Sequence, residues 1–133
     1  MRILLDTNVW LAVLTSDGQC RRGWRAARGG CQVFASPQVL GELEAKLRLK
    51  FGFSARHARL LTHFVQRQTT PVEPALPLPT VCRDGADNGI LAAALAGRCE
   101  LLVTGDQDLL VLKDFQGMHL VTPAEFANTV MGK

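Results

Sequence analysis

The sequence predicts an α/β fold in which helices flank a parallel sheet. Three short apolar runs without polar alternation carry this prediction, at residues 3–5, 31–35 and 101–104. Such runs are typical of strands that are buried on both faces, as in parallel sheets. The segments between them show the apolar spacing of helices. A final strand is expected near residues 119–121, and the prolines around Val72 restrict any strand there to an edge or a connector.

The chain has 133 residues and is expected to form one domain over residues 1–133. Its 47% hydrophobic and 20% charged residues are typical of a globular protein. No apolar run approaches the roughly 20 residues that span a bilayer. Asp6 interrupts the first apolar run too early for a signal peptide, so we predict a cytoplasmic protein without a membrane segment. The four cysteines show no CxxC spacing, which does not favour zinc.

The first predicted strand ends at a carboxylate, Asp6. In open α/β sheets, ligands bind beyond the carboxyl ends of the strands, so an acid at this position is suited to chemistry. The alternative is that Asp6 only caps the helix expected over residues 9–14. Thr7 or Asn8 is the other candidate for the N-cap of that helix.

A second helix is expected over residues 19–27 and carries a basic stripe. Arg21, Arg25 and Arg28 share one face at helical spacing, and such a stripe can contact phosphates. The alternative is an ordinary solvated face. A later helix, capped by Ser54, carries further arginines that offer a second face for phosphate contacts.

Ser36 and Pro37 predict the start of another helix, because a hydroxyl is a favoured N-cap and proline fits the first helical position. Glu42 borders the apolar stripe of this helix, about one and a half turns from its start. From there its carboxylate can reach the strand ends. The alternative is that Glu42 is an ordinary boundary residue.

Two acids precede a small apolar helix, which is expected over residues 90–96. Asp87 lies in its first turn, where the helix dipole stabilises a carboxylate. That role by itself accounts for the presence of Asp87. Asp84 is either the N-cap of the helix or a functional acid.

The third buried strand also ends in acids, the first of which is Asp106. Parallel strands point the same way, so Asp6 and Asp106 are expected at one edge of the sheet. Two like charges about 4 Å apart repel by roughly 4 kcal/mol at an effective dielectric of 20. A gathering of Asp6, Glu42, Asp87 and Asp106 therefore predicts a bound cation. Oxygen ligands without histidine or cysteine favour Mg²⁺ or Mn²⁺.

Four segments resemble the acidic motifs of the PIN domain, the fold of toxin ribonucleases in bacterial toxin–antitoxin pairs. They are ILLDTNVW, SPQVLGELEAKL, CRDGADNGILAAAL and ELLVTGDQDLL, in the order and at separations that suit the family. The resemblance covers nearly the whole chain. It implies a three-layer α/β/α PIN-like fold with a roughly five-stranded parallel sheet of order 3-2-1-4-5.

The resemblance also assigns roles to individual residues. The implied catalytic and metal-binding acids are Asp6, Glu42, Asp87 and Asp106. The implied accessory residues are Asp84, Thr104, Asp108 and Asn8, and the Thr104 hydroxyl is expected to orient the site. Gly85 and Gly89 depart from the more polar residues of the family pattern.

The implied activity is that of a metal-dependent endoribonuclease. It hydrolyses phosphodiester bonds of single-stranded RNA with Mg²⁺ or Mn²⁺ and leaves 5′-phosphate ends. The implied protein partners are a cognate antitoxin and a second copy of the chain in a homodimer. The stripe of Arg21, Arg25 and Arg28 is expected to contact the RNA.

Two alternatives remain. A phosphatase similar to the haloacid dehalogenases also begins with an apolar strand that ends in aspartate, but it needs a second aspartate where this chain has Asn8. The other alternative is a non-catalytic PIN-like binding module that keeps the acids for folding or for metal alone.

Overall fold

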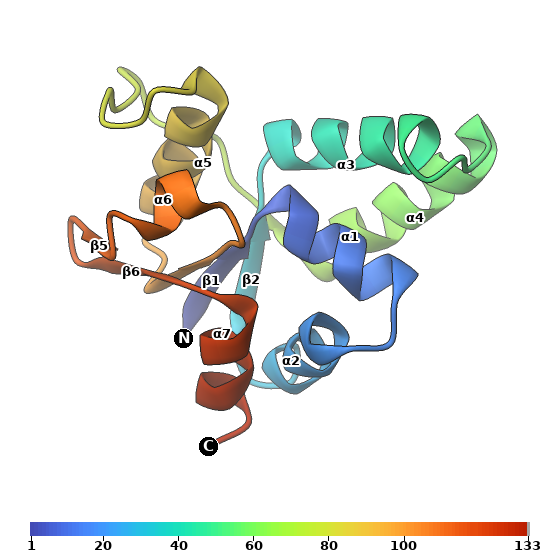
Figure 1. Cartoon of the computed structure of the whole chain (residues 1–133), viewed down its shortest axis with the longest axis horizontal. Coiled ribbons are helices and arrows are strands. Elements are labelled where there is room, and N and C mark those ends of the chain that lie inside the picture. The colour runs from blue at the N-terminus through green and yellow to red at the C-terminus, as the bar shows by residue number, and fades with distance from the viewer. Residues whose placement is uncertain (133) are drawn as a thin grey trace.

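The computed structural model describes residues 1–132, which form a six-stranded sheet between helices (Figure 1). The strands are β1 (Arg2–Leu5), β2 (Gln32–Ala35), β3 (Thr70–Pro71), β4 (Leu101–Val103), β5 (Asp114–Phe115) and β6 (Met118–Val121). The helices are α1 (Thr7–Thr15), α2 (Gln19–Ala27), α3 (Pro37–Leu49), α4 (Ala55–Gln68), α5 (Gly85–Ala96), α6 (Gln107–Leu110) and α7 (Pro123–Val130). Figure 1 shows α5 on one side of β1 and β2, with α1 and α2 on the other. The predicted α/β/α fold class is therefore confirmed.

The sheet has the order β3-β2-β1-β4-β6-β5. The first five of these strands are parallel, and they reproduce the predicted order because β6 takes the place of the fifth strand. The strand count differs from the prediction, since β5 adds a sixth strand antiparallel to β6. Gln116 and Gly117 form the two-residue turn between them, with φ of 50° and 85°. Positive φ at both positions gives the hairpin turn that matches the twist of the strands.

The central strand β1 lies between β2 and β4. Ile3, Leu4 and Leu5 have no exposed surface, which confirms that this run is buried on both faces. Because β1, β2 and β4 are parallel, their carboxyl ends meet at one edge of the sheet. The helices α1 and α3 and the segment before α6 start at this edge, so their first side chains converge.

The starts of the helices follow the predicted capping residues, with one correction. Ser36 and Ser54 are N-caps, as predicted. At α1 the N-cap is Asp6, whose carboxylate accepts the Thr7 N–H at 2.7 Å. The prediction of Thr7 or Asn8 as N-cap is therefore wrong. The chain passes from β1 to α1 through a single residue, which leaves Thr7 inside the helix.

The helix α5 begins earlier than predicted. Asp84 is its N-cap and accepts the Ala86 N–H at 2.9 Å. The helix therefore starts at Gly85 rather than at Ile90. The cap satisfies one of the N–H groups of the first turn, which offsets the low helix propensity of the glycines there. Asp87 lies in the first turn, as predicted.

The helix α7 packs against α2 at a close contact. Gly23 of α2 lies beneath the buried Phe126 ring, which an added Cβ would approach to 2.8 Å. Thr122 and Glu125 form a capping box at the start of α7. Within residues 1–132, no helix combines the length and apolar character needed to cross a membrane.

Candidate active site

Asp6 and Thr104 connect the ends of two neighbouring strands. Asp6 follows β1 and is 8% exposed, and Thr104 follows β4 and is fully buried. The Thr104 hydroxyl donates to Asp6 Oδ2 at 2.8 Å and accepts the Asp106 N–H at 3.0 Å. Asp6 Oδ1 accepts the Thr7 N–H. These hydrogen bonds hold the Asp6 carboxylate and the backbone of Asp106 at the same edge of the sheet.

Glu42 reaches this edge from α3. Its Oε1 accepts a hydrogen bond from the Thr7 hydroxyl at 2.9 Å. Burial raises the pKa of Asp6, hydrogen bonds from Thr104 and Thr7 oppose this shift, and the charges of Glu42 and Asp106 raise the pKa further. Asp6 is therefore close enough to both Glu42 and Asp106 to be repelled by each of them.

Asp87, Asp106 and Asp108 form a compact group of acids. Each offers one carboxylate oxygen, and these three atoms lie within 4.8 Å of one another. Asp87 is only 9% exposed. Burial raises the pKa of Asp87 to about 6, and the charges of Asp106 and Asp84 contribute to this shift. Ionisation of Asp87 beside these charges is unfavourable unless a cation is bound.

The donor atoms of this group fit a hard divalent cation, because all of them are carboxylate oxygens. The thiol of Cys82 lies nearby, since the charges of Asp87, Asp106 and Asp108 act on it. Burial, with these charges, raises the pKa of Cys82. Since the thiolate is the form that binds metal, this shift does not favour Cys82 as a metal ligand.

The remaining accessory residues lie around the acids. Asp108 pairs with Arg83 at 3.4 Å on the exposed surface. Asn8 accepts a hydrogen bond from Lys46 Nζ at 3.3 Å, which ties α1 to α3. The carboxylate of Asp84 serves as the N-cap of α5.

The basic stripe of α2 lies away from the acids. The Arg21 guanidinium donates at 2.7 and 3.2 Å to two carbonyl oxygens in the last turn of α1. Asp6 caps the opposite end of this nine-residue helix, roughly 13 Å away. The Arg28 guanidinium lies 5.1 Å from the centre of the Trp24 ring. Contact of Arg21, Arg25 and Arg28 with RNA stays a prediction.

Sequence analysis does not identify Gln38, which connects α3 with α5. Its Nε2 donates to the Ala86 carbonyl oxygen at 2.9 Å and to Glu42 Oε2 at 3.4 Å. Gly89 leaves room for it, because an added Cβ would lie 2.2 Å from Gln38 Oε1. This contact accounts for glycine where the family pattern has a more polar residue. The signal in the sequence is the spacing of Gln38 and Glu42 by one helical turn.

Asn88 is a second residue that the sequence analysis missed. Its buried side chain accepts the Cys82 N–H and donates to the Cys82 carbonyl oxygen, both at 3.0 Å. These bonds fasten the segment before α5 to the helix itself. They thereby fix the position of the start of α5, where Asp84 is the N-cap and Asp87 lies in the first turn.

A model of the PIN domain matches residues 2–108, a stretch that contains Asp6, Glu42, Asp87 and Asp106. The chain belongs to the PIN domain family. Proteins with this domain are generally nucleases that use divalent metal ions, and the group of acids in this PIN domain is compatible with metal binding. The family match gives no support to the haloacid-dehalogenase alternative.

Two solved structures share the fold of this PIN domain. VapBC2 from Rickettsia felis, bound to a DNA fragment from its promoter, is 14% identical with a TM-score of 0.67, and the match covers 92% of this chain and 98% of that one. PAE2754 from Pyrobaculum aerophilum is 17% identical with a TM-score of 0.66, and the match covers 100% of this chain and 91% of that one. No curated protein gives a significant match.

Proposed function

We propose that this PIN domain is a metal-dependent endoribonuclease of the cytoplasm, which hydrolyses phosphodiester bonds of single-stranded RNA. The observation that carries the proposal is the compact group of Asp87, Asp106 and Asp108 beside the buried Asp6. Burial, together with the charges of Asp106 and Asp84, raises the pKa of Asp87 to about 6, which favours a site that a cation completes. Family membership supports a nuclease as the class of enzyme.

In this proposal Asp6, Asp87 and Asp106 hold the cation, supported by Glu42 and, at the rim, by Asp84, Asp108 and Asn8. When bound, Mg²⁺ or Mn²⁺ supplies positive charge to the phosphate and lowers the pKa of water. The Thr104 hydroxyl keeps the Asp6 carboxylate in place. Thr7 and Gln38 hold Glu42, whose carboxylate can accept a proton as water attacks phosphorus. The expected products carry a 5′-phosphate.

The proposal includes a biological role as the toxin of a toxin–antitoxin pair. Residues 1–133 act as one domain, a cognate antitoxin is the expected inhibitor, and a homodimer is the expected assembly. The likeness in fold to VapBC2 of Rickettsia felis supports this role. The antitoxin would then be a separate protein that blocks access to the acids.

The test is cleavage of a mixed pool of single-stranded RNA by wild type, Asp6→Asn and Asp106→Asn, each with Mn²⁺ or with EDTA. Asp17→Asn is the matched control, because Asp17 is exposed beyond the far end of α1 and loses the same charge. We expect cleavage with 5′-phosphate ends only by wild type and the control, and only with Mn²⁺. Loss of a metal ligand should lower the rate about 100-fold or more.

Three results would contradict the proposal. Full cleavage by Asp6→Asn in the presence of Mn²⁺ would remove this acid from the mechanism. Absence of cleavage by wild type, together with a melting temperature that Mn²⁺ leaves unchanged, would favour the non-catalytic binding module. Turnover of a phosphate monoester in place of RNA would favour a phosphatase.

A further inference from the structure

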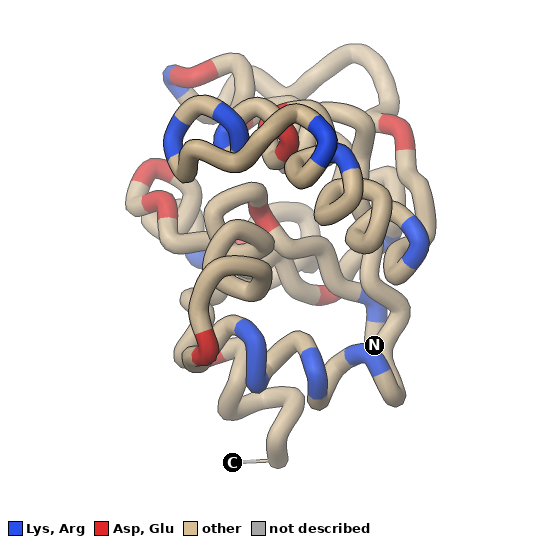
Figure 2. The backbone as a smooth tube through the Cα atoms, turned by 90° about the vertical axis from the view of Figure 1, so that its right-hand side faces the viewer, with Lys and Arg blue, Asp and Glu red and all other residues tan. Residues whose placement is uncertain are grey.

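The hairpin of α3 and α4 is a strongly basic surface. Between Glu44 and Glu73 the sequence has six basic residues and no carboxylate. These are Lys46, Arg48, Lys50, Arg56, Arg59 and Arg67. Figure 2 shows basic positions along the helices at the top of the molecule. Among residues 1–132, the ion pairs join Arg83 to Asp108 and His119 to Asp114, so none of the six hairpin cations is neutralised by such a pair.

The basic residues of α4 form one stripe. Arg56, Arg59, His63 and Arg67 follow one another at intervals of three or four residues, which places them within about 80° around the helix axis. All four are exposed, whereas the buried residues of α4 lie on the opposite face; these are Ala58, Thr62 and Val65. The stripe is roughly 16 Å long at 1.5 Å per residue. A multiply charged ligand can therefore contact several of its members.

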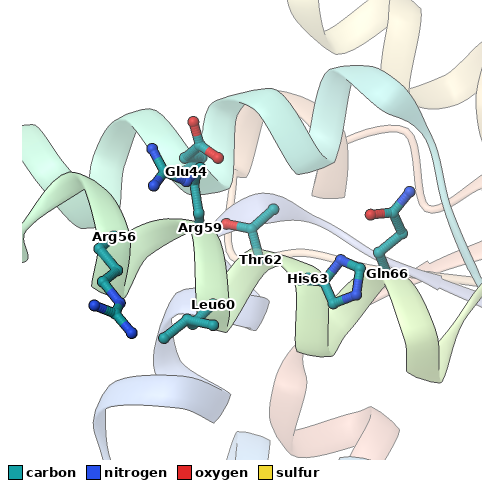
Figure 3. A pocket seen from close by; sticks show the side chains of 7 residues that line it. All are labelled: Glu44, Arg56, Arg59, Leu60, Thr62, His63 and Gln66. Atoms are coloured by element: carbon teal, nitrogen blue, oxygen red, sulfur yellow. The ribbon is translucent and has the colours of Figure 1, made fainter.

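Part of this stripe lines a hollow of about 460 Å³ between α3 and α4 (Figure 3). The residues that line it from α4 are Arg56, Arg59, Leu60, Thr62, His63 and Gln66, and Glu44 lines it from α3. Figure 3 shows Arg59 extending from α4 toward α3. The lining is rich in hydrogen-bond donors and carries two permanent positive charges against one negative charge. Such a lining suits phosphate oxygens better than an apolar peptide.

The hollow is separate from the acid site. Glu42 and Glu44 are two residues apart on α3, so they point about 200° apart around the helix. Glu42 contacts Thr7 of α1, whereas Glu44 faces α4. The helix α3 therefore stands between the acids and the hollow.

Arg56 and Arg59 of α4 differ in their contacts from Arg21 and Arg28, the two ends of the other basic stripe. Arg21 is hydrogen-bonded to α1 and Arg28 lies over Trp24, so both are engaged within the protein. Arg56 and Arg59 have no hydrogen bond or ion pair recorded among residues 1–132. Charge and availability together favour the α4 stripe as the surface for an anionic partner.

We propose that the hollow between α3 and α4, with the stripe of α4, is a second binding site for the phosphate groups of single-stranded RNA. This second site lies on the opposite side of α3 from the acids. It holds the RNA strand at a distance from the phosphodiester bond that is cleaved. The inference rests on the proposed function, because it takes RNA as the substrate. Contacts of this kind strengthen binding regardless of nucleotide sequence.

The test is the binding of a fluorescent single-stranded RNA, measured by anisotropy in EDTA so that cleavage does not intervene. The double variant Arg56→Gln/Arg59→Gln is compared with the control double variant Arg22→Gln/Arg98→Gln, which removes the same charge from exposed positions outside the hairpin. Glu44→Gln removes the one carboxylate of the hollow. The melting temperature of each variant checks that it is folded.

We expect the α4 double variant to bind RNA about 10-fold more weakly and to lower the salt slope of log K by roughly 1.4, since each phosphate contact of a single strand contributes about 0.7. The control double variant should change affinity less than about two-fold. Glu44→Gln should bind RNA more tightly than wild type. The difference between the α4 variant and the control, which lose the same charge, separates a local site from a general loss of charge.

Equal weakening by the control and α4 variants would overturn the inference, as would weaker binding by Glu44→Gln. If a poly-glutamate peptide competes for the hollow better than RNA does, the ligand of the hollow is an acidic protein and the inference is wrong. Different results would refute the two proposals. If RNA binds through α4 but is not cleaved in Mn²⁺, the proposed nuclease activity is refuted. If RNA is cleaved but the α4 variant binds it as tightly as wild type, the second site is refuted.

Discussion

The acid site has two sides that differ in how the protein holds its carboxylates. On the strand side, Asp6 accepts hydrogen bonds from Thr7 and Thr104, which oppose the effect of burial on its pKa. On the helix side, every influence on Asp87 raises its pKa, and a hydrogen bond with the Asp106 carboxyl is among them. The protein itself therefore orients Asp6, whereas Asp87 depends on a proton or a cation. On the strand side, hydrogen bonds within the protein hold the carboxylate in place. On the helix side, the carboxylate needs a bound ligand to be stabilised in its charged form.

The largest expected effect comes from Asp87→Asn without metal. The folded pKa of Asp87, about 6, exceeds its ordinary value of 3.8, so the folded state binds more protons between these values. The free energy of unfolding therefore falls as pH rises from 4 to above 6, by at most about 3 kcal/mol. The variant removes this loss and should be more stable than wild type at pH 8 but not at pH 4.

Urea denaturation in EDTA at both pH values measures this difference, with Asp17→Asn as the control for charge. Addition of Mn²⁺ at pH 8, at one thousand times the Kd, should reverse the order. Only wild type keeps the full ligand set, and its gain of about 4.1 kcal/mol exceeds the loss caused by ionisation of Asp87. A gap between variant and wild type that is the same at pH 4 and pH 8 would show that Asp87 ionises freely, and the contrast between the two sides would be lost.

The same two sides differ in how far the sequence predicts them. The edge shared by Asp6 and Asp106 follows from two apolar runs, because parallel strands must end together. The serine caps of α3 and α4 are equally local signals. The sequence leaves the roles of Asp84 and Asp87 open, since both lie within one turn and the choice depends on where α5 begins. That start is fixed by Asn88 and Cys82.

Contacts between distant segments explain what the sequence does not reveal. Gln38 and Gly89 meet across 51 positions of the chain, and no local pattern pairs them. Arg21 resembles a free phosphate ligand until the end of α1 is placed beside it. The strand β5 is only two residues long, which is too short for a pattern of alternation. The fold was thus predictable from local patterns, whereas the packing of the helix side was not.

A smaller effect is expected from Thr104→Val, which tests the strand side. Valine keeps the shape of threonine but leaves Asp6 Oδ2 and the Asp106 N–H without their buried partner. Loss of these bonds should lower the free energy of unfolding by about 1–3 kcal/mol. Thr104→Ser, which retains the hydroxyl, is the matched variant and should lose less. Equal melting temperatures for Thr104→Val and wild type would mean that the strand side is not held by this hydroxyl.

The smallest change in stability is expected from Gly89→Ala, although its effect on cleavage should be clear. The new Cβ displaces Gln38, whose hydrogen bond to Ala86 contributes about 0.5–1.5 kcal/mol. Alanine in place of glycine stabilises the helix by about 0.5–1 kcal/mol, so the two effects on the free energy of unfolding nearly cancel.

The effect on cleavage arises because Glu42 loses its contact with Gln38. The value of kcat/KM for RNA should therefore fall in Gly89→Ala as it does in Gln38→Ala. A double-mutant cycle decides the cause: if Gln38 acts by holding Glu42, Gly89→Ala has no further effect on kcat/KM in the Gln38→Ala background, and only stabilises the helix. An additional loss of kcat/KM in that background would show instead that the added methyl group moves α5 and Asp87 directly.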